Sequence, residues 1–274
     1  ILNMKYNLEK MNMLTQGGEA DWYEIDEHKI LRVVRKNNSA PFENEKIIFP
    51  VLIKNNILIP KVYEYIQIGE NQAEVMERIN GNTMLDNLMK HPFDIRNQIA
   101  QFAKIHQKIL SIHGENNLYS IEEVIEGFRN KPLKVKKEIF DFVIQILREL
   151  PTGDSVCHGD FHPGNILMQG DNKYVIDWSG VHVGNCVSDI AHTYLLMTHV
   201  PEIPGQSKIL HKIISLAGKY IAKLYLKEMH KLLNFDKKEF SKWLIVMTLF
   251  RVYFGLPSEQ KERKQYLKKQ YHKI

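Results

Sequence analysis

The chain has 274 residues, of which 44% are hydrophobic and 25% are charged. This usage is typical of a globular protein with a large core, and it excludes wholesale disorder, a collagen-like chain and a small disulfide-stapled scaffold. The longest strongly apolar stretch near the end, Trp243 to Phe250, is far shorter than the roughly 20 residues of a membrane span. The opening residues lack the apolar core of a secretory signal, and the two cysteines, Cys157 and Cys186, do not indicate an oxidising compartment. We therefore expect a cytoplasmic protein.

Charge is distributed unevenly along the chain. The net charge is +5, but residues 200–274 hold 16 Lys and Arg against 6 Asp and Glu, so residues 1–199 are net acidic. Such a skew indicates either an anionic partner or a solvated basic helix face. Nucleic acid is the less favoured partner, because contacts between a basic tail and phosphates would be diffuse and salt-sensitive.

The first part of the chain is predicted to be rich in strands. Runs of β-favouring residues, bounded by turn residues, predict strands at Trp22–Asp26, Lys29–Arg35, Val62–Ile68 and Ala73–Glu77. Glu27 and His28 join the first two strands as a hairpin. Helical spacing of apolar residues predicts a helix at Pro41–Lys54.

After Gly81 the apolar period becomes that of helices. The predicted helices are Asp94–His113, Leu133–Leu150, Val187–Thr198, Gln206–Leu233, Lys237–Phe254 and a basic tail helix from Ser258. Asp94 is the predicted N-cap of the first of them. The boundary between the two parts falls near Arg78–Asn82, so we expect an α+β fold with a small lobe, residues 1–79, and a larger lobe, residues 80–274.

The stretch most informative about chemistry is residues 157–189. Within it, Asn165–Gln169 and Tyr174–Asp177 are predicted strands on either side of the turn-rich Gly170–Lys173. If they pair, Asn165 and Asp177 lie at the same end of a hairpin, where opposite residues are about 5 Å apart. An amide oxygen and a carboxylate that converge in this way are suited to Mg²⁺ held together with a nucleotide.

Asp160 lies in a loop interrupted by glycine and proline, five residues before Asn165. A carboxylate there is a candidate to accept the proton of an attacking hydroxyl group. Asp and Asn beside Gly and Pro also occur in ordinary loops. What favours catalysis is the combination of His158, Asp160 and Asn165 with a following hairpin that ends in Asp177. A zinc site at His158 and His162 is disfavoured, because no Cys or His pair supplies the remaining ligands at the usual spacing.

The segments His158–Asn165 and Ile176–Trp178 resemble the aminoglycoside phosphotransferase and choline kinase-like family, which shares the protein-kinase fold. They correspond in kind to the kinase catalytic loop and to the Asp of the Asp-Phe-Gly motif. The resemblance implies that Asp160 is the catalytic base or hydroxyl-orienting carboxylate, and that Asn165 and Asp177 are the Mg²⁺ ligands.

Structural roles near the site are implied for two further residues. By the same resemblance, His158 supports the conformation of the catalytic loop, and Asp189 connects that loop to the following helix. His106 and the apolar residues of the 94–113 helix are interpreted as core.

The resemblance also assigns nucleotide-binding residues to the small lobe, with the larger lobe providing catalysis and substrate binding. Gly17 and Gly18 would let backbone amides approach phosphates. Arg32 stands where kinases have a strand lysine, and Glu45 is its helix partner. The hinge would be formed by Met76 behind the base, with the Glu77 carbonyl and the Ile79 amide facing adenine.

The expected activity is Mg²⁺-dependent transfer of the γ-phosphate of ATP or GTP to a hydroxyl of a small molecule. Only 11 residues separate Asp177 from Asp189 and no Ala-Pro-Glu follows, so a protein substrate is not expected. The alternative is a catalytically weak or silent nucleotide-binding module, since Arg32 replaces the strand lysine. We expect no nucleic-acid or membrane partner.

The charge of the larger lobe bears on the acceptor. Aminoglycosides are polycations that need acidic walls, whereas the chain after residue 199 is strongly basic. The acidic groups that remain available there include Glu202, Glu228 and Asp236. We therefore expect a neutral or anionic hydroxylated metabolite as the acceptor.

Overall fold

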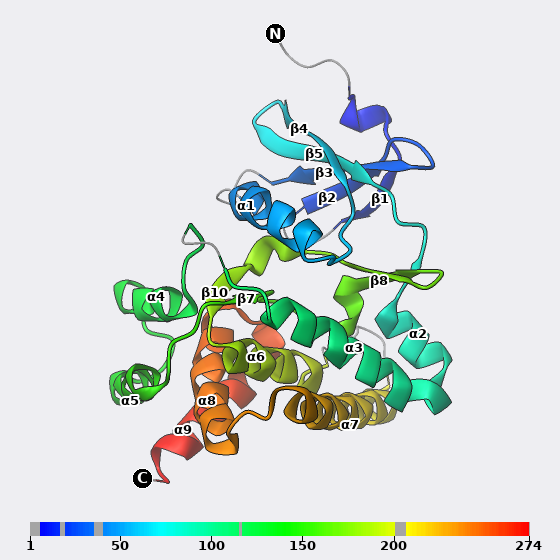
Figure 1. The fold of residues 1–274 in the computed structure, drawn as a ribbon. Helices are drawn as coiled ribbons and strands as arrows, with labels where there is room; N and C mark the ends of the chain where they lie inside the picture. Colours follow the sequence, from blue (N-terminus) through cyan, green and yellow to red (C-terminus); the bar gives the residue numbers. More distant parts are fainter. Residues whose placement is uncertain (1–5, 17–19, 36–40, 115–116, 201–206, 274) are drawn as a thin grey trace. The chain divides into compact units, whose positions relative to one another are not determined.

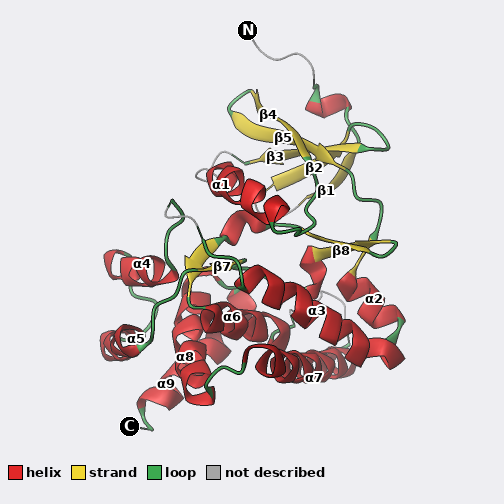
Figure 2. Cartoon of the chain, in the orientation of Figure 1, coloured by secondary structure: helices red, strands yellow, loops and turns green. Residues whose placement is uncertain are grey.

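The structure is a computed structural model that describes residues 6–16, 20–35, 41–114, 117–200 and 207–273. The chain forms two compact units. One unit, called the sheet unit, comprises Ile1–Asn87 and Gly164–Ser179, and the other, the helical unit, comprises Leu88–Pro163 and Gly180–Ile274. The predicted α+β class, with a strand-rich N-terminal region and a mostly helical C-terminal region, is confirmed (Figure 2).

The larger sheet of the sheet unit has five antiparallel strands (Figure 1). After the short helix η1 (Leu8–Lys10), its strands are β1 (Met13–Gln16), β2 (Ala20–Glu24), β3 (Lys29–Val34), β4 (Val62–Ile68) and β5 (Asn71–Glu77), in the order β1-β2-β3-β5-β4. Successive side chains of a strand point to opposite faces. Leu31 and Val33 of β3 therefore pack with Ala73 and Val75 of β5 on one face. On the other face, Phe42 of helix α1 (Pro41–Lys54) packs with Ala20 and Val34.

A smaller sheet in the same unit contains the predicted hairpin. Its strands β6 (Asn82–Thr83), β8 (Ile166–Gln169) and β9 (Asn172–Val175) lie in the order β6-β8-β9. The Val175 amide donates a hydrogen bond to the Leu58 carbonyl oxygen at 2.8 Å, which fixes the hairpin to the segment before β4.

Several predicted strand limits are wrong by one or two residues: the strands predicted at Trp22–Asp26 and Ala73–Glu77 are observed at Ala20–Glu24 and Asn71–Glu77. Two further limits lie at the hairpin. The strand predicted from Asn165 begins at Ile166, because Asn165 closes the 3₁₀ turn η4 (Pro163–Asn165). The strand predicted to end at Asp177 ends at Val175. Asp177 has a φ of 61°, in the left-handed region, which an extended strand cannot include.

The helical unit contains a short antiparallel pair, β7 (Ser155–Cys157) and β10 (His182–Gly184). The remaining elements of the chain are α2 (Met84–Lys90), η2 (Pro92–Asp94), α3 (Ile95–Leu110), α4 (Ile121–Glu126), η3 (Gly127–Asn130), α5 (Lys137–Glu149), η5 (Trp178–Gly180), α6 (Cys186–Thr198), α7 (Lys208–Leu233), α8 (Lys237–Phe254), η6 (Pro257–Glu259) and α9 (Gln260–Tyr271). Helices α3, α6, α7 and α8 pack on one another around fully buried side chains such as Phe102, Tyr225 and Trp243 (Figure 1).

Several helix predictions need correction. The helix predicted to end at His113 ends at Leu110, and the tail helix predicted from Ser258 begins at Gln260. The helix predicted from Leu133 begins at Lys137, because the preceding Lys136 has extended backbone angles and Leu133 is largely exposed. Asp94 occupies the N-cap position of α3 but its side chain makes no capping hydrogen bond, since it ends the 3₁₀ turn η2. Among the described helices, none combines the length and the apolar character that crossing a membrane requires.

Candidate active site

The loop that follows β7 has a conformation that only glycine at position 159 permits. Gly159 has a φ of 80°, and a Cβ added to it would lie 2.1 Å from the Gly180 carbonyl oxygen. The next aromatic residue, Phe161, is fully buried and stacks on the rings of Phe102 and His106. Local backbone geometry and a buried aromatic ring together fix the loop on α3.

Asp189 of α6 connects the loop to two helices. Its carboxylate accepts hydrogen bonds from the backbone amides of His158 and Gly159 at 2.8 and 3.2 Å, and it lies 3.1 Å from His106 Nε2. His106 Nδ1 lies 2.6 Å from the Tyr225 hydroxyl. Burial alone would raise the pKa of Asp189, but the bond and charge of His106 hold that pKa well below its usual range. The carboxylate is therefore an ionised acceptor inside the helical unit.

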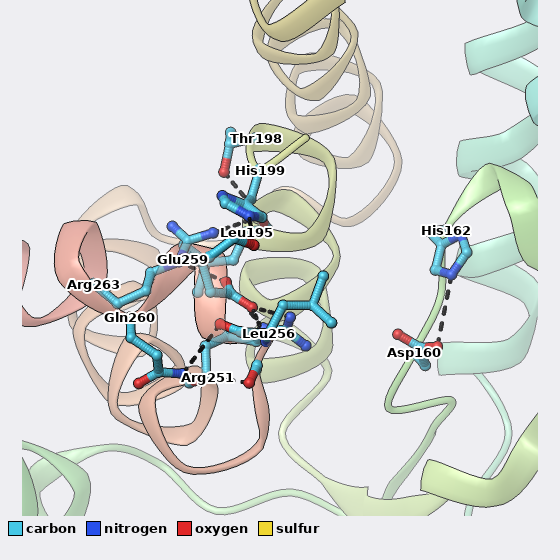
Figure 3. Close-up of polar contacts among 12 residues, drawn as sticks. Asp160, His162, Leu195, Thr198, His199, Arg251, Leu256, Glu259, Gln260 and Arg263 are labelled. Atoms are coloured by element: carbon cyan, nitrogen blue, oxygen red, sulfur yellow. Dashed lines mark hydrogen bonds and ion pairs between the residues drawn. The ribbon is translucent and has the colours of Figure 1, made fainter. Parts of the chain in front are cut away.

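Asp160 is half-buried, and its backbone amide donates to His158 Nδ1 at 3.2 Å. Its carboxylate lies 3.6 Å from His162 Nε2 (Figure 3). Burial raises the pKa of Asp160. The hydrogen bond and charge of His162, followed by the charges of His192 and His158, lower it by a larger amount, so that the pKa is about 2. Asp160 is consequently ionised at neutral pH and able to accept a hydrogen bond from a hydroxyl group.

His192 of α6 is a residue near Asp160 that the sequence did not single out. It is buried, and burial lowers the pKa of its imidazole to about 4. Its ring packs edge-on against Phe250. At neutral pH the imidazole is therefore uncharged. It carries a charge only in acid, where Asp160 itself titrates.

Asn165 and Asp177 lie at the same end of the β8–β9 hairpin, within the sheet unit. Ile166 is paired with Val175, and the Ile176 amide donates to the Asn165 carbonyl oxygen at 3.0 Å, so the pairing continues one residue beyond the strands. Asp177 is exposed and its Oδ1 accepts a bond from the Ser179 hydroxyl at 2.8 Å. An amide oxygen and a carboxylate at one hairpin end are hard ligands of the kind that Mg²⁺ prefers.

Arg32 and Glu45 are paired, and a third residue joins them. Arg32 Nη1 donates to both Glu45 oxygens, at 2.8 and 3.0 Å, and to Glu74 Oε1 at 3.0 Å. All three side chains are buried, and the guanidinium lies 5.5 Å from the ring centres of Trp22 and Phe42. Sequence reasoning missed Glu74. The available signal was a charged residue within the apolar run of β5, directly opposite Arg32 in the sheet register.

One guanidinium does not offset the burial of two carboxylates. Burial is the largest influence on Glu45 and, together with the charge of Glu74, it outweighs Arg32 and raises the pKa of Glu45 to about 7. The pKa of Glu74 is raised as well, also chiefly by burial. The cluster therefore has a protonation equilibrium near neutral pH.

The other predicted nucleotide-binding residues are described only in part. Met76 and Ile79 are buried and Glu77 ends β5. The Glu77 amide donates to the Lys61 carbonyl oxygen at 2.8 Å, and Glu77 Oε2 accepts from the Lys61 amide at 3.1 Å, so β5 is held at this end. Gly17 and Gly18 lie outside the described residues.

A second polar cluster lies in the helical unit around Glu259, apart from the Asp160–His162 pair in Figure 3. Glu259 is fully buried, pairs with Arg251, and lies 3.0 Å from Arg263 Nε; Arg263 Nη2 donates to the Leu195 carbonyl oxygen at 2.9 Å. This cluster joins α8, η6 and α9 to the end of α6. All of its charged groups are paired within it.

Two cavities in the helical unit have mixed or basic linings. One, of about 430 Å³, is lined in part by His199, His211, Lys219 and Glu262. The other, of about 270 Å³, is lined by Arg96, Lys227, Lys231, Glu228 and Leu224. Glu228 is paired with Lys231 at 2.7 Å. Carboxylates are not in excess in either lining.

Two other acidic residues expected to be available for substrate in this lobe are Asp236 and Glu202. Asp236 accepts bonds from the amides of Lys238 and Glu239 as the N-cap of α8. Glu202 lies outside the described residues.

Comparison with known proteins gives a family and a fold. The sequence pattern of the phosphotransferase enzyme family matches residues 14–207. No curated protein matches the chain at a significant level.

Similar solved structures share 11–15% sequence identity with the chain, so their likeness establishes the fold alone. A thermostable mutant of aminoglycoside phosphotransferase APH(4)-Ia, in ternary complex with ADP and hygromycin B, has a TM-score of 0.66 at 14% identity, covering 96% of this chain and 92% of that one. The amicoumacin kinase hAmiN, in complex with AMP-PNP, Ca²⁺ and Ami, has a TM-score of 0.60 at 15% identity, with 97% and 89% covered. ADP-bound aminoglycoside phosphotransferase APH(2'')-Ib has a TM-score of 0.59 at 14% identity, with 96% and 93% covered.

The family match extends over most of the chain and includes the loop and the hairpin described above. The chain therefore belongs to the phosphotransferase enzyme family, and it has a protein-kinase-like fold.

Proposed function

We propose that the chain transfers the γ-phosphoryl group of Mg²⁺-bound ATP or GTP to a hydroxyl group of a small molecule. The observation that carries this proposal is the pair of hard oxygen ligands, Asn165 and Asp177, at one end of a hairpin fixed to the sheet unit. The family membership and the nucleotide complexes of the similar structures support it.

In this proposal Asn165 and Asp177 hold the metal ion. The exposed Asp177 carboxylate, oriented by Ser179 and by a left-handed backbone, is suited to a ligand that arrives from solvent. Mg²⁺, when bound there, would neutralise charge on the transferred phosphoryl group and its leaving oxygen. The chain itself contributes positioning of the reactants, which supplies most of the rate enhancement in phosphoryl transfer.

Asp160 is proposed to accept a hydrogen bond from the acceptor hydroxyl and to orient its oxygen towards phosphorus. With a pKa of about 2, this carboxylate is a weak base at neutral pH. It therefore acts chiefly by orientation and takes up the proton late, as the new O–P bond forms. Asp189 and His158 hold the loop in place through the bonds described above.

In this proposal Arg32, which lies between the sheet and helix α1, would contribute positive charge for nucleotide binding. Its Nη1 is already bonded to Glu45 and Glu74, which supports a role in fixing α1 on the sheet. This engagement is also the observation that favours the second candidate, a nucleotide-binding module with weak or no transferase activity. Gly17, Gly18, Met76, Glu77 and Ile79 keep their proposed roles in binding the nucleotide.

For the acceptor we propose a neutral or anionic hydroxylated metabolite. Neither of the two cavities described above has an excess of carboxylates, and Glu228 and Asp236 are engaged by Lys231 and by the start of α8. A polycationic aminoglycoside would find little Coulombic attraction there.

The test is phosphoryl transfer, followed by mass spectrometry, from Mg-ATP or Mg-GTP to a panel of aminoglycosides and of neutral and anionic hydroxylated metabolites. We expect a phosphorylated product from the latter two classes. In Asp160→Asn, turnover should fall by about 10²–10⁴ with nearly unchanged nucleotide affinity. The matched control is Asp154→Asn, which changes an exposed carboxylate.

Each result separates the candidates. Nucleotide binding without any product would favour the silent module. Efficient phosphorylation of kanamycin-like compounds would refute the proposed acceptor class. Undiminished turnover of Asp160→Asn would refute the role of that carboxylate.

A further inference from the structure

The first half of α7 exposes a continuous apolar surface. Five side chains, here called the α7 outer face, are between 47% and 76% exposed: Ile209, Leu210, Ile213, Leu216 and Tyr220. The fully buried residues of α7, Ala222, Tyr225 and Met229, all lie in its second half. At about 100° per residue, the outer face occupies an arc of roughly 120°, centred about 150° away from the buried residues. Large apolar side chains grouped in this way indicate a contact surface.

Lysines border this face on one side. Lys208, Lys212, Lys219 and Lys223 fall within an arc of about 60° next to the apolar one. The whole helix has six lysines and one acidic residue, Glu228, and Glu228 is paired with Lys231. An apolar arc beside a row of lysines is typical of helices that lie in the interface of an anionic membrane.

Charge disfavours a second copy of this chain as the occupant. An antiparallel pair of α7 helices related by a two-fold axis would bring Lys212 and Lys219 of the two copies towards each other. Like charges at the flanks of a helix pair are repulsive. A cationic face is complemented by an anionic partner.

The length of the apolar arc disfavours a partner helix. The exposed apolar arc ends at Tyr220. Leu224, one turn later, is half-buried in the lining of the smaller cavity, and Lys227 and Lys231 occupy the arc two and three turns later. The apolar stretch is therefore only about 16 Å long, much shorter than the three or more heptads of a sustained helix–helix seam. A bilayer accommodates this pattern, because the first half of α7 can enter the headgroup region while the later lysines contact lipid phosphates.

We propose that α7 docks the protein on an anionic lipid bilayer, with the α7 outer face inserted at the boundary between headgroups and acyl chains and the flanking lysines against lipid phosphates. This peripheral contact differs from the sequence-based expectation of no membrane partner, because the sequence does not reveal which side of α7 faces solvent. The proposal is independent of the phosphotransferase reaction, since none of these residues belongs to the proposed catalytic site.

The test is co-sedimentation of the full chain with vesicles of phosphatidylglycerol and phosphatidylcholine in equal parts, compared with vesicles of phosphatidylcholine alone. We expect binding to the anionic vesicles only. Ile213→Ser with Leu216→Ser should weaken it by at least about tenfold, because two buried apolar side chains are lost. Lys212→Gln with Lys219→Gln should weaken it by about tenfold or more, since each lysine near an anionic surface contributes roughly fivefold.

Matched controls are Leu133→Ser, an exposed leucine outside α7, and Lys10→Gln with Lys136→Gln. These should bind as the wild type does, and all variants should keep the wild-type melting temperature. Three vesicle results would overturn the proposal: no binding to anionic vesicles, equal binding to both kinds of vesicle, or unchanged binding in both α7 double variants.

Two further measurements distinguish other occupants. A dimer detected by light scattering and abolished by Ile213→Ser with Leu216→Ser, without vesicle binding, would assign the face to a second copy. Binding of a designed helical peptide with a leucine seam and glutamate flanks, again without vesicle binding, would assign it to an acidic protein. Either result would overturn the proposal.

Discussion

At the scale of single residues, the unusual feature is the buried cluster of Arg32, Glu45 and Glu74. A lone guanidinium bonded to two buried carboxylates leaves the cluster with an excess negative charge when both are ionised. Burying a charge without a partner is far more costly than burying a neutral group. The cluster should therefore respond very differently to removal of its cation and to neutralisation of one of its anions.

We predict that Arg32→Met lowers the free energy of unfolding by about 3–5 kcal/mol, because it leaves two buried carboxylates without a cation. Glu74→Gln should change it by less than about 1 kcal/mol, since the amide oxygen can still accept from Arg32 and one excess charge is removed. Urea unfolding at neutral pH measures both. The control is Arg35→Met, whose partner Asp21 is 2.6 Å away in a more exposed pair, so that this change should cost much less stability than Arg32→Met. Equal costs for Arg32→Met and Glu74→Gln would contradict this account.

Helix α6 holds the loop that carries Asp160. Asp189, in the first turn of α6, accepts from two consecutive loop amides and contacts His106 of α3. A loop rich in glycine and proline has no regular hydrogen-bonding pattern of its own, so these bonds from a neighbouring helix determine its conformation. The position of Asp160 thus depends on a carboxylate 29 residues later in the chain.

We predict that Asp189→Asn lowers the free energy of unfolding by about 3 kcal/mol near neutral pH, since the amide nitrogen cannot accept from a loop amide and the ionic partner of His106 is lost. The deficit should depend on pH. The folded-state pKa of Asp189 lies below its ordinary value of 3.8, so its stabilisation is present above about pH 4 and is lost as pH falls through the folded-state pKa.

Denaturant unfolding at several pH values checks this prediction. The difference between wild type and Asp189→Asn should shrink as the pH falls from about 4 towards the folded-state pKa of Asp189. Asp154→Asn, a change in an exposed carboxylate, should give little difference at any pH. A difference that grows in acid would refute the assignment of Asp189 as an ionised acceptor.

At the scale of the whole molecule, the sequence was sufficient for the order and type of most elements. Helices 41–54 and 237–254 and strand 62–68 have the predicted limits, because apolar periodicity and terminal residues agree there. The predicted and observed limits of elements differ where contacts with distant residues determine the local backbone conformation. Residue 177 has a left-handed backbone that no strand pattern reveals, and the hairpin around it belongs to the sheet unit through its bond to Leu58.

Contacts between side chains were harder to predict from the sequence than helices and strands were. The pairing of Arg32 with Glu45 was expected from the resemblance, whereas Glu74 needed the register of β3 with β5, which a single sequence does not fix. His192 and the exposed side of α7 depend on how helices pack. Which side of a helix is buried depends on the elements that pack against it. Elements that are distant in sequence cannot be identified as neighbours from the apolar pattern of the helix alone.

In the proposed function, the end of the β8–β9 hairpin holds the metal of a Mg-nucleotide. Titration calorimetry of Mg-ATP into the wild type, Asp177→Ala and Asp171→Ala tests it most directly, because Asp171 is an exposed carboxylate in the turn of the same hairpin. We predict Mg²⁺-dependent binding that is abolished in Asp177→Ala and retained in Asp171→Ala. Unchanged Mg-ATP affinity in Asp177→Ala would contradict the account.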